Sequence, residues 1–385
     1  MHVLCFQQVS LGQGRQLEHS LAQGYLGRNI RSVYFGGGTP SLAPPTFVPS
    51  ILETLEKNGC NILPDAEITL EANPTSLPDL KALTNHGITR LSIGVQSLAS
   101  TETLRSMNRE HTSEQAIRML EGLVSSPHQL KHGFTFDLMF GMPNQTREDW
   151  AKELELATPF AQHGGHLSLY ELTLEPSTPL KKAVRAGRVT VPDEDTKADM
   201  YEAAVDAMRD AGLEHYEISS FAKPGRWGAH NYSFWMGADL VGIGPGAHGR
   251  ITDLKSRRKV STRTIPSPRL WEAQVRDVGT GVIARDELTE EEYAVQLLAG
   301  GLRTKTGLSA RIFRERMNNG LTLDQFLDLD EVNRFVDEGF LEYDKDDKAV
   351  KNMGYSKTYN FSEGSLRPTE KGMRVIDSIL PMLTP

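Results

Sequence analysis

The sequence predicts an α/β protein in which strands and helices alternate along most of the chain. Runs of β-branched and aromatic residues have the length of strands, and several are nearly continuous in apolar residues, which is typical of strands buried on both faces. Amphipathic helical segments separate them at intervals of ~25–40 residues. This alternation favours a parallel sheet, either doubly wound or curled towards a barrel. The strand-like runs are 32–35, 67–70, 90–95, 133–140, 166–172 and 215–219.

The helical segments between these runs begin and end with recognisable signals. Thr146 is a hydroxyl N-cap, and two acidic residues follow it in the first turn. Ser113 opens a second helix whose apolar residues recur at helical spacing. A third helix carries Met200 on its apolar face and stops near Gly212.

Length and composition indicate a globular protein with more than one domain. The chain has 385 residues, of which 38% are hydrophobic and 24% are charged. A net charge of −8 argues against nucleic acid and anionic membranes as partners. No apolar run approaches the ~18 residues of a membrane span, and residues 1–10 lack the pattern of a secretory signal. With only Cys5 and Cys60, the chain has no disulfide framework.

Polar residues follow the strand-like runs at the point where each run ends. The carboxyl ends of parallel strands meet at one edge of a sheet, so these residues are expected to share a ligand site. Each residue alone has an alternative: the glycines could form only a tight turn, and Glu71 could be a structural hydrogen-bond acceptor. A GxGxxG fingerprint and a GxxxxGK[ST] loop are both absent, which disfavours nicotinamide and P-loop functions. The strand-end residues are Gly37, Gly38, Thr39, Glu71, Gln96 and Asp137.

Five motifs in a fixed order make the chain resemble the radical S-adenosylmethionine (SAM) family. The resemblance is to the branch that contains oxygen-independent coproporphyrinogen III oxidases and HemW-type heme chaperones. Two further segments, LSLYELTLEP at 167–176 and HNYSFW at 230–235, resemble the HemW side, although Phe234 replaces the tyrosine of its HNxxYW signature. The five motifs are YFGGGTPS at 34–41, LEANP at 70–74, LSIGVQS at 91–97, NR at 108–109 and DLMFGMP at 137–143.

The resemblance implies a partial (β/α)6 barrel with a smaller, mainly helical, winged-helix-like C-terminal domain. We expect the barrel over 1–250 without its first strand and cluster loop, a linker or loop over 251–285, and the C-terminal domain over 286–385. The basic stretch 255–259 is expected to be an exposed connector, with porphyrin propionates as an alternative partner. Although winged helices commonly bind nucleic acid, the acidic stretch 324–347 argues against it here.

The same resemblance implies a SAM site at the strand ends. Gly37, Gly38 and Thr39 would hold the methionine end of the cofactor. Glu71 and Gln96 would bind it through a carboxylate and an amide. Arg109 and Asp137 match further family positions near SAM, with a one-residue insertion before Arg109. The site assigned by resemblance is therefore Gly37, Gly38, Thr39, Glu71, Gln96, Arg109 and Asp137.

The departure from the family is the absence of its CxxxCxxC loop. A [4Fe–4S] cluster requires cysteine thiolates, and the family binds it through three of them. Residues 1–29 contain only Cys5, and Cys60 lies far downstream. Catalytic residues and metal ligands are therefore not expected, nor is reductive cleavage of SAM. One explanation is a truncated isoform or gene model; the other is a protein that discarded the cluster, with residues 3–6 as a substitute first strand covering a sheet edge.

His230 is the candidate heme ligand, because imidazole binds heme iron and aromatic residues lie beside it. A packing or domain-docking role for the same segment is the alternative. His248 is a weaker candidate. His163 and His166 are expected to lie in a turn before a strand.

The function expected from these features is that of a heme chaperone, which binds heme and delivers it to a hemoprotein client. The alternatives are an oxidase of porphyrin biosynthesis, which would need the missing cluster, and a catalytically silent scaffold. The chain could form a homodimer. If it is eukaryotic, a mitochondrial location is expected, with a presequence in the missing stretch, and otherwise a cytoplasmic one.

Overall fold

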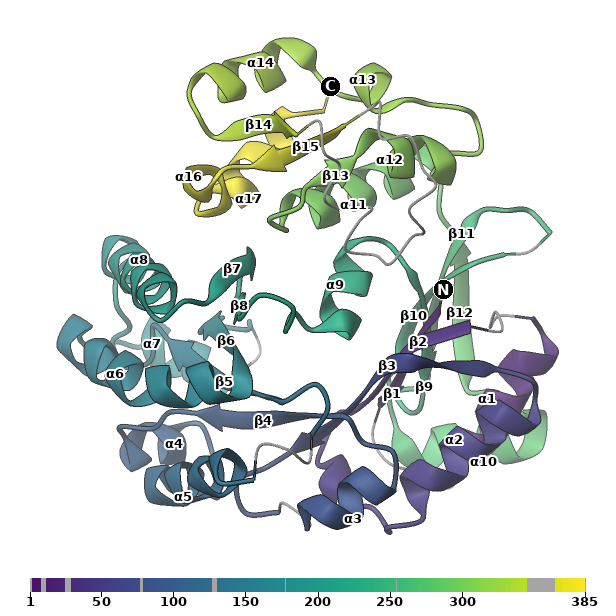
Figure 1. Cartoon of the computed structure of the whole chain (residues 1–385), viewed down its shortest axis with the longest axis horizontal. Helices are drawn as coiled ribbons and strands as arrows, with labels where there is room; N and C mark the ends of the chain where they lie inside the picture. Colours follow the sequence, from purple (N-terminus) through teal and green to yellow (C-terminus); the bar gives the residue numbers. More distant parts are fainter. Residues whose placement is uncertain are drawn as a thin grey trace.

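The computed structural model describes residues 2–7, 12–24, 29–76, 79–126, 130–176, 178–253, 255–344 and 364–384. Within them, a large mixed sheet of twelve strands has the order β12-β11-β10-β9-β1-β2-β3-β4-β5-β6-β8-β7 (Figure 1). Its strands are β1 His2–Gln7, β2 Asn29–Gly36, β3 Asn61–Ala72, β4 Arg90–Gln96, β5 Phe134–Phe140, β6 Gly165–Glu171, β7 Glu214–Glu217, β8 Ser220–Ala222, β9 Asp239–Ile243, β10 His248–Thr252, β11 Lys259–Thr264 and β12 Val282–Glu287.

Strands β1 to β6 are parallel, and β9 runs parallel to β1 on its other side. The expected α/β barrel architecture is confirmed by this arrangement. Helices cover the outer face of the curved sheet, while α9 lies on the concave side, where it contacts β1 and β2 (Figure 1). The helices of this part are α1 Gln13–Ala22, α2 Phe47–Lys57, α3 Leu80–Asn85, α4 Thr101–Ser106, α5 Ser113–Val124, α6 Arg147–Gly164, α7 Pro179–Arg185, α8 Glu194–Asp210, α9 Ala229–Trp235 and α10 Pro268–Val278.

The N-terminal segment forms strand β1, although the family's first strand was expected to be missing. Strand β1 pairs in parallel with β2 and also with β9, so it lies inside the sheet. Pairing of residues 3–6 as a substitute first strand that covers the edge of β2 is therefore confirmed, and the expectation that the first strand is missing was wrong. Strand β9 in turn pairs with the other side of β1. Residues 8–11 and 25–28, in the region where the family has its cluster loop, lie outside the described residues.

The stretch 251–285 is not a linker. It contains the end of β10, all of β11 and α10, and most of β12, and these strands extend the large sheet by antiparallel pairing. The stretch is rich in basic residues and proline, a composition typical of an exposed connector. Antiparallel strands, however, can be joined by short turns, so short strands form here at the edge of the sheet. The positions of the domain boundaries, 250 and 286, stay a prediction.

The inner and outer faces of the barrel strands differ in polarity. Outward residues such as Val33, Phe35 and Leu70 are buried against the helices in the main apolar core. Inward residues are polar, so the strands alternate in polarity. Strands β4 and β5 are nevertheless buried along almost their whole length, which confirms the expectation of strands buried on both faces. In register, polar residues meet polar ones across neighbouring strands: Ser32 pairs with Glu67, and Asp137 pairs with Ser168. A buried polar face requires internal hydrogen-bond partners, and these define the site described below.

The C-terminal part is a smaller, mainly helical module with its own apolar core, as predicted. A three-stranded antiparallel sheet of order β13-β15-β14 lies beside its helices (Figure 1). Its elements are α11 Glu290–Leu302, β13 Leu308–Ser309, α12 Ala310–Arg316, α13 Leu323–Phe326, α14 Leu329–Asp337, β14 Leu341–Asp344, β15 Ser365–Pro368, α16 Glu370–Met373 and α17 Ile376–Ile379. Across the described residues, no helix is both long and apolar enough to cross a membrane.

Candidate functional site

Glu71 organises the end of β3 together with the glycine loop that follows β2. Its Oε1 accepts a hydrogen bond of 2.6 Å from the Tyr34 hydroxyl, and its Oε2 accepts one of 2.8 Å from the backbone N–H of Gly37. A Cβ atom at Gly36 would lie 2.8 Å from Glu71 Oε1, so only glycine allows the carboxylate to come this close. Gly37 and Gly38 have φ values of 74° and 72°, which are left-handed conformations that glycine adopts without strain.

Asn73 connects the loops that follow β2 and β3. Its Nδ2 donates a hydrogen bond of 3.0 Å to Thr39 Oγ1. The interaction fixes Thr39 next to the carboxyl end of β3. Asn73 was not assigned to the site from the sequence. Its position in the LEANP motif and its amide side chain, which can both donate and accept hydrogen bonds, could have indicated this role.

The side chains of Gln96 and Arg109 both lie near Gly94, close to the end of β4. A Cβ atom on Gly94 would lie 3.3 Å from Gln96 Nε2 and 4.0 Å from both Arg109 Nη1 and Asn73 Oδ1. Gln96 itself has a φ of 71°, a conformation that is uncommon for a residue with a side chain. The structure thus brings Arg109 to the strand-end group despite the one-residue insertion before it.

Asp137 on β5 belongs to the same electrostatic group. Burial, followed by the charge of Glu71, raises the pKa of Asp137 to about 7, while a hydrogen bond with Ser168 and the charge of Arg109 oppose this rise. Burial and the two carboxylates also hold the pKa of Tyr34 well above its usual value. Two carboxyl groups and one guanidinium are therefore close enough to influence one another electrostatically, which suits a ligand that carries both positive and negative charge.

His230 lies inside the barrel and not on a separate surface. It is the second residue of α9, and its Nδ1 lies 3.2 Å from Ser32 Oγ. Its ring packs against the ring of Tyr34, with 4.8 Å between the centroids. Burial lowers the pKa of His230 to about 4, although the nearby Glu67 opposes the shift. The imidazole is therefore neutral at physiological pH, and Tyr34 links it to Glu71.

A buried ion pair holds α9 in this position. Glu67 accepts hydrogen bonds of 2.9 and 3.0 Å from the backbone N–H groups of Ala229 and His230. It also pairs with Arg90 at 3.5 Å, and both side chains are less than 5% exposed. Burial alone would raise the pKa of Glu67, but Arg90 and the two N–H groups outweigh it and hold that pKa below its usual value. The sequence analysis did not predict this pair, because Glu67 and Arg90 lie in different strand-like runs and no local pattern links them.

His166 belongs to strand β6, so the expectation of a turn was wrong for it. Its Nδ1 lies 2.7 Å from Thr135 Oγ1 and its Nε2 lies 2.8 Å from the Tyr216 hydroxyl. Burial holds the pKa of His166 well below its usual value. Both ring nitrogens are thus used inside the polar face of the barrel. His163, by contrast, lies exposed in the last turn of α6.

The two cysteines do not provide a cluster site. Cys5 lies in β1 beside Tyr34 of β2, whereas Cys60 is buried immediately before β3, at the opposite end of that strand from Glu71. Among the described residues, no group of three or more His, Cys, Asp and Glu side chains could hold a metal ion. A [4Fe–4S] cluster bound by three thiolates therefore does not fit the donors of this chain.

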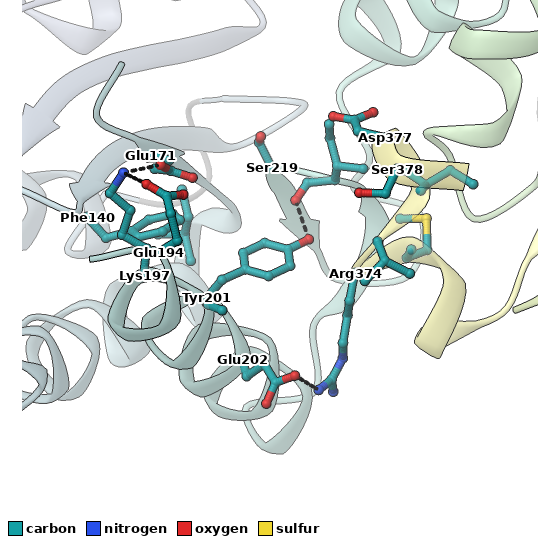
Figure 2. Close-up of a pocket in the computed structure, with 16 residues that line it drawn as sticks. Phe140, Glu171, Glu194, Lys197, Tyr201, Glu202, Ser219, Arg374, Asp377 and Ser378 are labelled. Carbon is teal, nitrogen blue, oxygen red and sulfur yellow. Dashed lines mark hydrogen bonds and ion pairs between the residues drawn. The ribbon is translucent and has the colours of Figure 1, made fainter. Parts of the chain in front are cut away.

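A cavity of about 460 Å³ lies between the barrel and the C-terminal module, and none of the strand-end residues lines it. Figure 2 shows two ion pairs in its lining: Lys197 contacts Glu171 at 3.0 Å, and Arg374 contacts Glu202 at 3.4 Å. The Tyr201 hydroxyl donates to the backbone carbonyl of Ile218 at 2.8 Å. Of these contacts, the pair of Arg374 and Glu202 joins the C-terminal module to the barrel.

The chain is similar to a known family and to several known proteins. The radical SAM superfamily matches residues 16–157. Radical S-adenosyl methionine domain-containing protein 1, mitochondrial, of Mus musculus is 36% identical over 365 residues, covering 93% of this chain and 76% of that protein. Heme chaperone HemW of Escherichia coli is 35% identical over 244 residues, covering 62% of this chain and 61% of that protein.

A solved structure shares the fold. Coproporphyrinogen III oxidase (HemN) from Escherichia coli, a radical SAM enzyme, superposes on this chain with a TM-score of 0.73. The match covers 99% of this chain and 89% of that one, at 20% identity, so it shows the fold alone. The sequence relatives carry the assignment further: the chain belongs to the radical SAM superfamily, in the group that includes radical S-adenosyl methionine domain-containing protein 1 and heme chaperone HemW.

Proposed function

We propose that this chain binds heme and delivers it to a hemoprotein, and that its strand-end site holds SAM without cleaving it. The observation that carries the proposal is the contact of His230 with Tyr34, whose hydroxyl is bonded to Glu71. Through this contact, the candidate heme ligand and the candidate SAM site share one polar interior. The names of the relatives, which include heme chaperones, support the heme part of the proposal.

SAM fits the chemistry of the strand-end residues. Its ammonium and sulfonium are cations that Glu71 and the ionised form of Asp137 would attract, and its carboxylate would be attracted by Arg109. The backbone of the glycine loop is open to close approach at Gly38, where an added Cβ would meet nothing within 4 Å. When bound, SAM would supply a sulfonium cation to this site. Gly37, Gly38, Thr39, Gln96 and Asn73 would position it.

His230 suits heme because its imidazole stays neutral at physiological pH, and a neutral ring nitrogen is the form that binds iron. Glu67 and Arg90 would fix the position of this ring through the first turn of α9. The oxidase alternative needs cluster thiolates, and the two cysteines of this chain do not supply them. A silent scaffold would bind neither ligand.

Heme titration tests this assignment. Addition of heme to the chain is expected to shift the Soret band, and His230→Ala is expected to weaken binding and change the band position. His163→Ala removes an exposed imidazole far from the barrel interior and should behave like the unsubstituted chain. Absence of a Soret shift, or equal shifts for His230→Ala and the parent, would remove the heme site. Transfer is then measured with apomyoglobin as the acceptor, whose spectrum reports arriving heme.

We also propose a mitochondrial location, because the names of several relatives carry that word. Fractionation of cells that express the full-length gene product tests it. Recovery in the cytosolic fraction alone would contradict this location. The expectation of a homodimer stays a prediction, which sedimentation analysis would check.

A further inference from the structure

Two adjoining cavities lie on the side of α9 that faces β10 and α11. One, of about 260 Å³, lies between Trp235, Arg250 and the α11 residue Gln296. The other, of about 240 Å³, continues over β10 and β11. Phe234 and Arg250 line both cavities, so they form the boundary between them. Neither cavity contains a residue of the strand-end site.

Three buried polar atoms in the first cavity lack a partner. Within the described part of the chain, Trp235 Nε1, Arg250 Nε and Gln296 Oε1 make no hydrogen bond. Buried polar groups are almost always paired, because losing water without gaining a partner is unfavourable. Two donors and one acceptor that line the same cavity therefore point to a ligand or ordered water between them.

Arginines outnumber acidic residues around these atoms. The first cavity is lined by Arg250 and by Arg303, which pairs with Asp377 at 2.7 Å, and the second adds Arg263 with one acidic residue, Asp286. Burial lowers the pKa of Arg250. Among the described residues, no ion pair involves Arg250. The neighbouring Lys259 differs, since it pairs with Asp239 at 2.6 Å.

The cavity of Figure 2 differs from this one in how its charged residues are paired. There, Lys197 and Arg374 each contact carboxylates of the same chain, so the lining is neutralised internally. At Arg250 no carboxylate of the described residues compensates the charge. A half-buried arginine whose buried Nε has no partner there is a specific attraction for an external anion.

Aromatic rings complete the lining. The Phe234 ring is 39% exposed and stands edge-on to the Trp235 ring, with 5.4 Å between the centroids. The guanidinium of Arg303 lies 5.8 Å from the centre of the Trp235 ring. Exposed flat surfaces beside cations suit a flat conjugated group that carries a negative charge.

We propose that the two cavities around Arg250 bind a small ligand in which an oxyanion is attached to a flat conjugated ring. Arg250 would hold the oxyanion, Trp235 Nε1 and Gln296 Oε1 would hydrogen-bond the ligand, and Phe234 would contact its ring. A nucleotide phosphate and a porphyrin propionate are two sources of this chemistry. The site does not depend on the heme and SAM proposals, because it shares no residue with them.

The test uses AMP and metal-free protoporphyrin IX as separate probes on the whole chain, with binding followed by calorimetry and by tryptophan fluorescence. We expect at least one probe to bind and Arg250→Gln to weaken it by about tenfold or more, as for loss of a charged hydrogen bond. Arg250→Lys, which keeps the charge but not the planar fork, should give an intermediate loss. Trp235→Phe keeps a ring and removes only the Nε1 donor, so it should weaken binding less.

Arg258→Gln is the matched control, since Arg258 lies on the surface near the same sheet edge and pairs with Glu287. It should leave probe affinity unchanged, and circular dichroism should show Arg250→Gln folded. His230→Ala should also leave AMP affinity unchanged, which separates this site from the heme proposal. AMP binding alone identifies a phosphate site, and protoporphyrin binding alone identifies a carboxylate site. Absence of binding by both probes, or equal affinities for Arg250→Gln and the parent, would mean that only water occupies the cavities and would overturn the proposal.

Discussion

The hydroxyl of Tyr34 donates a hydrogen bond of 2.6 Å to Glu71 Oε1. Glu71 in turn accepts from the backbone of Gly37, while the Tyr34 ring packs against His230. One tyrosine thus connects the glycine loop, the carboxylate at the end of β3 and the imidazole of α9. A ligand that displaces or strengthens the contact at Glu71 would be felt at His230 through this single side chain.

Replacement of Tyr34 by phenylalanine tests this connection. Tyr34→Phe removes the hydrogen bond to Glu71 but keeps the ring against His230, so we expect SAM affinity to fall by roughly 10- to 160-fold, the range for a hydrogen bond to a charged group. Equilibrium dialysis with SAM measures the effect. Tyr343→Phe alters an exposed tyrosine of β14 and should leave the affinity unchanged. An unchanged affinity in Tyr34→Phe would exclude a role for this bond in SAM binding.

The raised pKa of Asp137 predicts how SAM binding depends on pH. Because that pKa is about 7, the carboxyl is mostly neutral at pH 6 and mostly ionised at pH 8. A cationic ligand prefers the ionised form, so SAM affinity is expected to rise as pH increases through 7. Asp137→Asn should remove this dependence and weaken binding at pH 8. A pH profile that is the same in both proteins would exclude Asp137 from the site.

The same group affects stability in the opposite direction. Its pKa is higher in the folded chain than its ordinary value of 3.8, so the folded state binds more protons between about pH 4 and 7. The free energy of unfolding should therefore fall as pH rises through this window, by up to about 4 kcal/mol. Urea unfolding of the parent and of Asp137→Asn, at pH 5 and pH 8, measures the difference. A smaller pH effect in Asp137→Asn is expected, and an equal one would contradict the assignment.

The buried pair of Glu67 and Arg90 should be essential for stability. Glu67→Ala leaves Arg90 buried without its partner and deprives two backbone N–H groups of α9 of their acceptor, so a loss of about 3–5 kcal/mol is expected. Chemical denaturation measures it. Glu53→Ala breaks an exposed pair with Lys57 and is expected to cost less than about 1 kcal/mol. Similar losses in both variants would show that Glu67 is not the anchor of α9.

Gly36 and Gly122 form a matched pair of glycines. An added Cβ at Gly36 would lie 2.6 Å from the Tyr34 ring and 2.8 Å from Glu71, whereas one at Gly122 would meet nothing within 4 Å. Gly36→Ala is therefore expected to weaken SAM binding and lower stability. Gly122→Ala, in the last turn of α5, should leave binding intact and stabilise the chain by up to about 1 kcal/mol. The thermal midpoints and SAM affinities of the two variants give the comparison.

By itself, the sequence determined the alternation of strands and helices, the polar residues at the strand ends and the smaller C-terminal module. Each of these rests on local signals: hydrophobic periodicity, N-caps such as Thr146, and glycines that leave the backbone accessible. The motif order also identified the family before the fold was known. The sequence also shows directly that this chain has two cysteines, fewer than the three thiolates that the family's cluster needs.

Only the tertiary structure decided which strands lie side by side and what faces the barrel interior. Strand β1 lies between β2 and β9, and the basic stretch after residue 250 became part of the sheet, because strand pairing depends on hydrogen bonds between segments far apart in the chain. His230 meets Ser32 across 198 positions, and Glu67 anchors α9 across 163. The unpartnered atoms around Arg250 likewise result from packing α9, β10 and α11 together. Local periodicity contains no information on such distant contacts, since they form only when the sheet curves and its concave face is closed.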